Sequence, residues 1–503
     1  MSLPRAAHFR LPEDCHQNDL QSALATAGQL EWARARKDTT EVLDNFPADI
    51  WASGAVLCRK PDGSLQWWQE ARLVTSSRAP AGSRFWWDLP ASALRDQLAA
   101  SIGLWSLMPV ASLSITRKAL TLRNADAKIV VRGEVCTVGV ADTHVSVQAL
   151  RGYDAEFEQV CQLLRDLGAA AVEPFDLRQQ LVAAGNAPQV LVHKGPYGIE
   201  AGEAAEPAVR RMALSMFRLA RRFEAGVLDD TDTEFVHQYR VSLRKLRSLL
   251  SLMKSTLPAD LPLQAKSELA RMAGAMGTLR DLDVFLLDQQ RYRQMLPQAF
   301  HPGFDHLITQ ISKDRQRALS TTRRQLRSPS YAKRCAHLVQ LLESAPQRQE
   351  GAAVKPVGRV ASARILKRYT RIRTASLQVH AETPDEHIHQ IRIECKKLRY
   401  MLEFFAELYP KSRLKSLSRS LKRLQDVLGR FNDVSVQQGF LARYAERSND
   451  PQQSAAIHGL IAVLHQDQLQ LRDQAERELQ QFAQDDISAN FSTMFGRNGA
   501  TTK

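Results

Sequence analysis

No run of about 18 consecutive apolar residues occurs in the 503-residue sequence, so we expect no membrane-spanning helix and no membrane partner. The first ten residues contain no basic segment followed by an apolar core, and a secretory signal is therefore not predicted. Both absences favour a cytoplasmic protein. Apolar residues still make up 44% of the chain, which is typical of a folded protein, and the length predicts two or three domains.

Cysteine is scarce and scattered, because the chain has six cysteines and no Cys-x-x-Cys motif. The pairs Cys15-His16 and Cys335-Ala336-His337 are isolated, and each supplies too few ligands for a local zinc site. This pattern argues against a disulfide framework and is typical of a reducing cytoplasm. We expect no metal and no cofactor.

Positive charge is unevenly distributed along the chain. Residues 1–190 contain 19 Lys and Arg against 21 Asp and Glu, a net charge of −2, although the whole chain carries +14. The remainder of the chain therefore carries a net charge of +16. This asymmetry predicts an anionic partner for the C-terminal part, but it does not say which anion.

The two parts also differ in the period of their apolar residues, which predicts an α+β chain. Residues 55–60 and 64–68 have the pattern of strands and flank a Pro-Asp-Gly turn, which predicts a β-hairpin. After about residue 200 the apolar residues recur with the period of α-helices. We expect four segments: a β-rich domain at 1–184, a linker at 185–202, a helical domain at 203–485 and a tail at 486–503.

The helical part contains an internal repeat at a spacing of 152 residues. Residues 236–247 align with residues 388–399 without a gap, and the same offset aligns Gly277 with Gly429 and Asp281 with Asp433. An unbroken register over several helices predicts a duplicated helical unit, with copies at about 203–345 and 355–485.

Each copy contains a helix with a cationic stripe opposite an apolar face. An α-helix advances about 100° per residue, which gathers the basic residues on one side. In the first copy the stripe consists of His237, Arg240, Arg244 and Arg247. In the second copy it consists of His389, Arg392, Lys396 and Arg399. Two further lysines flank the stripes, namely Lys245 and Lys397.

A charged stripe on one helix is usually a solvated face. These stripes differ because each stays single-signed, each begins with a histidine, and the whole pattern is duplicated. Two such stripes facing each other would repel by about 1–4 kcal/mol per close pair, and a multivalent anion between them would turn that repulsion into attraction. Arg, Lys and His all suit phosphate oxygens. We expect Asp281 and Asp433, with Asn432, to be helix-terminal partners that orient the arginines.

These helices, each followed by a turn of the type Gly277 to Asp281, closely resemble the CHAD family, the conserved histidine α-helical domain. The resemblance covers about residues 203–485 and implies two pseudo-symmetric four-helix bundles. It also implies a basic groove that binds inorganic polyphosphate, and association with polyphosphate granules in bacteria. The anion ligands implied by the resemblance are His237, Arg240, Arg244, Lys245, Arg247, His389, Arg392, Lys396, Lys397 and Arg399, with Arg271 and Arg423 as additions.

The N-terminal part is similar to a CYTH domain, a triphosphate tunnel metalloenzyme barrel, in the order of its features. Residues 37–60 look like that family's Asp-Thr to Arg-Arg stretch, and residues 131–135 look like its Gly-containing turn. The catalytic acids do not match, because residues 4–8 and 144–148 contain no Asp or Glu and position 131 is Val. Divalent metal needs hard oxygen ligands, chiefly carboxylates. We therefore expect a degenerate antiparallel β-barrel-like domain without catalytic activity.

Three functions remain from different classes. The leading hypothesis is a non-enzymatic polyphosphate-binding protein. The alternatives are a tripolyphosphate hydrolase that uses the N-terminal domain, and a nucleic-acid-binding protein. Aromatic side chains that could stack on bases are scarce on the stripes, where only Tyr400 falls. Oligomeric state is not predicted by the sequence.

Overall fold

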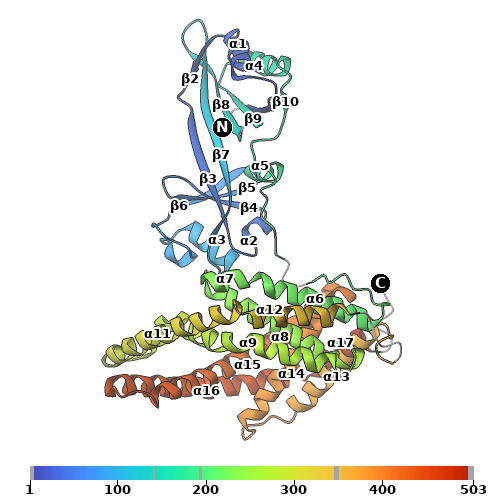
Figure 1. The fold of residues 1–503 in the computed structure, drawn as a ribbon. Coiled ribbons are helices and arrows are strands. Elements are labelled where there is room, and N and C mark those ends of the chain that lie inside the picture. Colours follow the sequence, from blue (N-terminus) through green and yellow to red (C-terminus); the bar gives the residue numbers. More distant parts are fainter. Residues whose placement is uncertain (1–4, 140–141, 192–194, 345–350, 497–503) are drawn as a thin grey trace. The chain divides into compact units, whose positions relative to one another are not determined.

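The computed structural model describes residues 5–139, 142–191, 195–344 and 351–496 of the chain (Figure 1). The chain forms two compact units, Met1–Val192 and His193–Lys503, and each is described by itself. Among the described residues, no helix is both long and apolar enough to cross a membrane.

The N-terminal unit is built on a ten-stranded antiparallel sheet. Its central strand β7 (Met108–Arg123) pairs with β8 (Ile129–Val138) along one edge and with β3 (Arg36–Asp44) and β2 (Gln29–Trp32) along the other. The remaining strands are β1 (Ala6–Arg10), β4 (Ala55–Arg59), β5 (Ser64–Gln69), β6 (Arg72–Arg78), β9 (Asp142–Ala149) and β10 (Ala170–Ala171). The expected hairpin is confirmed, since β4 pairs with β5 around Gly63, which has a φ of +81° that glycine adopts readily.

The sheet is not the closed barrel that the CYTH resemblance implies. The strand order is β10-β1-β9-β8-β7-β3-β4-β5-β6, and in the described part of the chain no ladder joins the two edge strands. Closure requires the edges to pair along their length. The edge strand β10 has only two residues, so it offers too few backbone groups to pair with β6. A sheet-rich fold is therefore confirmed, while a relationship to the CYTH family stays a prediction.

Helices cover the sheet in separate places. The helices are α1 (Gln17–Ala25), α2 (Asp49–Ala52), α3 (Ala93–Ile102), α4 (Asp154–Asp166) and α5 (Leu177–Ala183). Three apolar clusters lie between sheet and helices, and they include Phe157 of α4, Leu181 of α5 and Leu98 of α3. The core of this unit is thus divided along the sheet rather than enclosed within it.

The C-terminal unit is built mainly of helices, and these recur at the offset that the sequence predicts. Helix α8 (Thr233–Leu252) and helix α14 (Asp385–Phe404) begin and end 152 residues apart. The first copy consists of α6 (Ala205–Arg222), α7 (Glu224–Asp229), α8, α9 (Leu261–Leu287), α10 (Gln289–Met295), α11 (His301–Leu326) and α12 (Pro329–Glu343). The second consists of α13 (Val357–Ser376), α14, α15 (Lys411–Ala445), α16 (Pro451–Phe482) and α17 (Asp485–Phe495).

The two copies meet where α6 and α13 begin. The backbone N–H of Val357 donates to the carbonyl of Glu203 at 2.8 Å, and the N–H of Ala205 donates to the carbonyl of Lys355 at 3.1 Å. These bonds satisfy N–H groups that the first turn of a helix leaves without a partner. Each repeat thus caps the first helix of the other.

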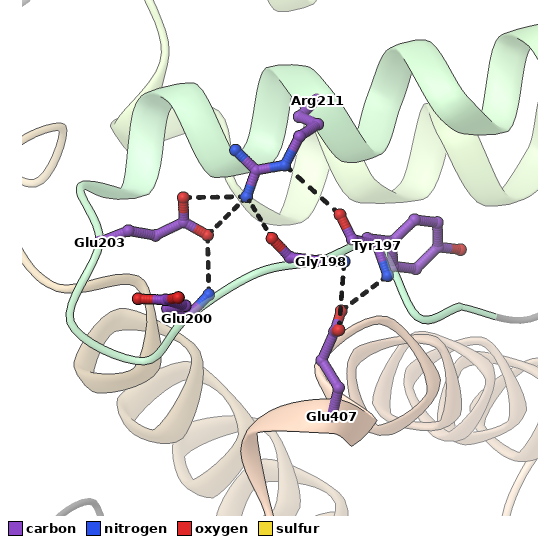
Figure 2. A network of polar contacts seen from close by, with 6 residues as sticks. All are labelled: Tyr197, Gly198, Glu200, Glu203, Arg211 and Glu407. Carbon is purple, nitrogen blue, oxygen red and sulfur yellow. Dashed lines mark hydrogen bonds and ion pairs between the residues drawn. The ribbon is translucent and has the colours of Figure 1, made fainter.

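A segment before α6 also ties the copies together, and we call residues 195–203 the strap. The carboxylate of Glu407, in the second copy, accepts hydrogen bonds from the backbone N–H groups of Tyr197 and Gly198 at 2.8 and 3.2 Å (Figure 2). The guanidinium of Arg211, on α6, donates to the carbonyl of Gly198 at 2.9 Å and to Glu203 at 2.7 Å. The strap is therefore held by charged side chains from both repeats.

Candidate anion-binding site

Helix α8 owes its position to a cap and an apolar face. The Asp232 side chain accepts hydrogen bonds from the N–H groups of Glu234 and Phe235, at 2.9 and 3.3 Å, which starts the helix. One face then buries Tyr239, Leu243 and other apolar side chains almost completely. The opposite face carries the cationic stripe, so burial of the apolar face aims the stripe away from the core.

The stripes of α8 and α14 meet in one cavity of about 650 Å³, which we call the polar cavity. It lies between α8, α9, α10, α14, α15 and α16. Eight basic side chains line it: Arg240, Arg244, Arg280, Arg291, Arg392, Lys396, Arg430 and Arg443. His237 also lines it. The duplicated helices therefore contribute cations to a single site, as the repeat predicts.

Four aspartates offset part of this charge, namely Asp281, Asp288, Asp433 and Asp467. Asp433 lies 3.7 Å from the guanidinium of Arg392. Asp281 is the main carboxylate facing Arg240, and burial raises the pKa of Asp281. The expected orienting role fits these positions, but the expected helix-terminal placement is wrong. Both aspartates lie inside long helices, α9 and α15, because Gly277 and Gly429 continue those helices instead of forming turns.

His237 is neutral at physiological pH. Burial, the largest cause, and the nearby Arg280, Arg244 and Arg240 together lower its pKa to about 4. A neutral imidazole can still donate one N–H to an oxyanion. Before an anion binds, His237 therefore offers the cavity a hydrogen-bond donor and not a charge.

The cations of the polar cavity are crowded and partly desolvated. Burial lowers the pKa of Lys396 to about 8, and Arg392 and Arg244 act in the same direction. Burial also lowers the pKa of Arg240, Arg280 and Arg392. Mutual repulsion and desolvation both disfavour the charged forms, so a bound anion would stabilise this arrangement.

A second cavity, of about 560 Å³, lies between α8, α9 and α14, and we call it the apolar cavity. It shares Arg244, Arg392 and Lys396 with the polar cavity. Four other cations line it, namely Arg247, Lys254, Lys266 and Lys397. Because the two cavities share three side chains, their cations form one continuous track.

Seven of the twelve residues proposed from the sequence line these cavities: His237, Arg240, Arg244, Arg247, Arg392, Lys396 and Lys397. The other five residues do not line either cavity in the part of the chain that the structure describes. Lys245 and Arg399 lie 2.8 and 3.5 Å from Glu403, and Arg423 lies 2.9 Å from Glu478. His389 and Arg271 are exposed. The two histidines of the repeat thus occupy different environments.

Four arginines that line the polar cavity are not among the twelve residues proposed from the sequence: Arg280, Arg291, Arg430 and Arg443. They come from α9, α10 and α15, and not from the striped helices. Arg280 and Arg430 lie within the Gly-containing motifs at 277–281 and 429–433, which was the available signal. Their orientation toward the cavity depends on helix packing, which a single-helix wheel does not include.

Among the residues that the structure describes, no group of three or more His, Cys, Asp or Glu side chains could hold a metal ion. The polar cavity is consistent with this, since its carboxylates are interspersed among eight cations.

Comparison with known proteins finds a described domain in the helical unit. Residues 211–442 match the family model of the CHAD domain. Two proteins of Mycobacterium tuberculosis, both described as uncharacterized, are each 25% identical over 399 residues, covering 74% of this chain and 74% of the relative. The solved CHAD domain from the plant Ricinus communis is 23% identical, covers 56% of this chain and 93% of that chain, and has a TM-score of 0.48. PptA from Streptomyces chartreusis is 23% identical, with 56% and 99% covered and a TM-score of 0.40.

Proposed function

Because residues 211–442 form a CHAD domain, we propose that this chain binds inorganic polyphosphate between its two helical repeats and does not hydrolyse it. One observation carries the proposal: the cationic stripes of α8 and α14 line the same cavity. Arg240 and Arg244 come from the first repeat, and Arg392 and Lys396 come from the second. Guanidinium groups bind phosphate oxygens in bidentate fashion, and Lys adds a point charge.

Unsatisfied donors support an oxyanion as the ligand. The Nη1 of Arg280 and the Nε of Arg392 are buried and have no acceptor among the residues that the structure describes. A buried charged donor without an acceptor costs about 1–3 kcal/mol or more. Phosphate oxygens would supply the acceptors.

The continuity of the track supports a linear polyanion over a compact one. Cations extend from Arg280 at the polar cavity, through the shared Arg244 and Lys396, to Arg247 and Lys397 at the apolar cavity. A single phosphate would contact only part of this track. A chain of phosphates would contact successive side chains along it.

The N-terminal unit supports a non-enzymatic function. Strands β1 and β9 pair with each other, with His8 opposite Ser146 and Ala6 opposite Gln148. None of these four side chains is a carboxylate, and the carboxylate that β9 does carry, Asp142, already lies 2.8 Å from the guanidinium of Arg10. These positions therefore do not assemble the cluster of carboxylates that a divalent metal prefers. Purified protein with Mg²⁺ or Mn²⁺ should release no phosphate from tripolyphosphate, and metal-dependent release would contradict this part of the proposal.

Two double variants of equal charge test the binding proposal. Arg244→Ala with Lys396→Ala removes two cations of the track. Arg271→Ala with Arg423→Ala removes two cations of α9 and α15 outside the cavity linings. We expect the first pair to weaken long-chain polyphosphate binding at least tenfold and the second less than threefold. By analogy with single-stranded nucleic acid, the track variant should also lower the slope of log affinity against log salt by about 1.4. Equal effects of the two pairs would contradict the proposal.

In cells, we propose that the protein is associated with polyphosphate granules. A tagged copy should follow the granules and disperse when the polymer is absent. The Arg244→Ala, Lys396→Ala variant should be dispersed in both conditions, while the Arg271→Ala, Arg423→Ala control should follow the granules.

A further inference from the structure

The apolar cavity has a feature that an inorganic phosphate chain does not use. Part of its lining, which we call the floor, consists of apolar side chains from the three helices α8, α9 and α14: Leu250, Leu252, Pro262, Leu263, Leu269, Ile393 and Tyr400. Leu263 is 69% exposed, although an apolar side chain in a cavity would gain free energy by being covered. Inorganic polyphosphate has no apolar surface with which to cover it. The cavity therefore suits a ligand that carries both phosphate and an apolar ring or chain.

The charges around this floor all have one sign. Seven cations line the cavity, and among the described lining residues there is no Asp or Glu. The polar cavity differs, because four aspartates line it. Of the seven cations, Lys397 lies 2.8 Å from the carboxylate of Glu394, just outside the lining. An anionic group bound here would meet no carboxylate in the wall.

Polar groups that could recognise a ring lie at the same floor. Tyr400 lines the cavity and is 2% exposed, and its hydroxyl has no hydrogen-bond partner among the residues that the structure describes. The side chain of Tyr400 lies close enough to the guanidinium of Arg392 to interact with it electrostatically. Ser248 and Ser251 add two further hydroxyl groups to the lining. A buried hydroxyl without a partner is costly unless a ligand supplies one.

We propose that the apolar cavity binds the base of a nucleoside triphosphate, with its phosphates on Arg244, Arg392 and Lys396. The volume of about 560 Å³ is in the range of small-molecule sites, which combine an apolar lining with a few placed polar groups. A base would cover Leu263 and Ile393 and offer hydrogen-bonding edges to Tyr400. The three phosphate-binding cations are shared with the polar cavity, so nucleotide and polyphosphate compete. The inference goes beyond the proposed function and does not require it.

The test compares ATP with inorganic triphosphate, which has the same number of phosphates and no base. Both are titrated calorimetrically, without divalent metal, into the full chain. Leu263→Ser removes apolar surface without changing charge and should weaken ATP binding about tenfold while leaving triphosphate binding unchanged. Leu377→Ser is the matched control, because Leu377 is a 60% exposed leucine outside both cavities, and it should change neither affinity.

Tyr400→Phe provides a second variant that keeps the packing of the ring. It should weaken ATP binding several-fold and leave triphosphate binding unchanged, whereas a purely structural hydroxyl would change neither. Equal affinity of wild type for ATP and triphosphate, with no effect of Leu263→Ser, would overturn the inference. Tighter binding of octyl phosphate than of ATP would overturn the nucleoside assignment. ATP binding without polyphosphate binding would instead overturn the proposed function and support the inference.

Discussion

Lys245 of the first repeat lies 2.8 Å from the carboxylate of Glu403 in the second repeat, while the preceding residue, Arg244, lines both cavities. Adjacent residues on α8 project in directions about 100° apart. One side chain therefore joins the repeats, and its neighbour faces the anion track. This separation makes the structural and binding contributions of α8 measurable independently.

The first prediction is that alanine substitutions of Lys245 and Arg244 have opposite consequences, one for stability and the other for polyphosphate binding. Lys245→Ala should lower the free energy of unfolding by about 1–2 kcal/mol, because it leaves a largely buried Glu403 without its partner from the other repeat. It should leave polyphosphate affinity within about twofold. Arg244→Ala should reduce polyphosphate affinity with little loss of stability. Chemical denaturation and a binding titration of both variants decide the matter, and a larger binding loss for Lys245→Ala would contradict it.

The second prediction concerns Lys396, whose pKa is lowered to about 8 from 10.5. A bound polyanion favours the charged amine and raises this pKa, so binding at pH 8 takes up protons and affinity falls as the pH rises above 8. Without ligand, the unfolded chain holds this proton more tightly than the folded chain, so the Lys396 contribution to stability rises between pH 8 and 10.5.

Calorimetry in two buffers of different ionisation enthalpy measures the proton uptake. Lys396→Arg is the matched control, because Arg keeps its charge in this range. The variant should show smaller uptake at pH 8 and retain its affinity at pH 9. Identical proton uptake by wild type and Lys396→Arg would show that another group titrates.

The third prediction concerns His237, whose pKa is lowered to about 4 from 6.5. Below pH 6.5 the unfolded chain binds a proton that the folded chain does not, so this residue lowers the stability as pH falls from 6.5 to 4. The loss should be on the order of 1–3 kcal/mol. His237→Gln should reduce the difference in unfolding free energy between pH 7 and pH 5. An NMR titration that finds His237 half-protonated near pH 6.5 would contradict the prediction.

The fourth prediction uses two glycines at equivalent positions in the repeats. A Cβ on Gly277 would lie 3.4 Å from the Nη1 of Arg240, whereas a Cβ on Gly429 would meet nothing within 4 Å. Gly429→Ala should therefore stabilise the protein by about 0.5–1 kcal/mol through its helix propensity, with unchanged affinity. Gly277→Leu should displace Arg240 and weaken polyphosphate binding. Thermal unfolding and binding of both variants provide the test, and a binding loss confined to Gly429→Ala would refute it.

Local patterns in the sequence predict a large part of the helical unit. The 152-residue offset predicts that α8 and α14 are equivalent, and the helical wheel places Arg240, Arg244 and Lys396 on faces that line one cavity. The wheel fails for His389, which is exposed, because burial depends on the neighbouring helices. Next to His237 those neighbours include Arg280, and the equivalent position in the second repeat is Asn432.

Non-local contacts account for the other failures. The pairing of Lys245 with Glu403 and the contribution of Arg443 both depend on helices that are distant in sequence. The same is true of the sheet, whose strands have the expected patterns but whose edges do not close. Strand patterns specify which faces are buried, whereas closure depends on the lengths of the edge strands.

The strap has a practical consequence for isolating the helical unit. The family match begins at residue 211, but the strap lies N-terminal to it and occupies the charged groups of Arg211 and Glu407. A fragment that starts at residue 211 would lack the first turns of α6. It would also leave the carboxylate of Glu407 without its two backbone N–H donors, and it would expose Gly358, which lies against Ala201. Fusions and domain transplants should therefore start before Gly195. We expect a fragment that starts before Gly195 to be more stable to unfolding than one that starts at residue 211.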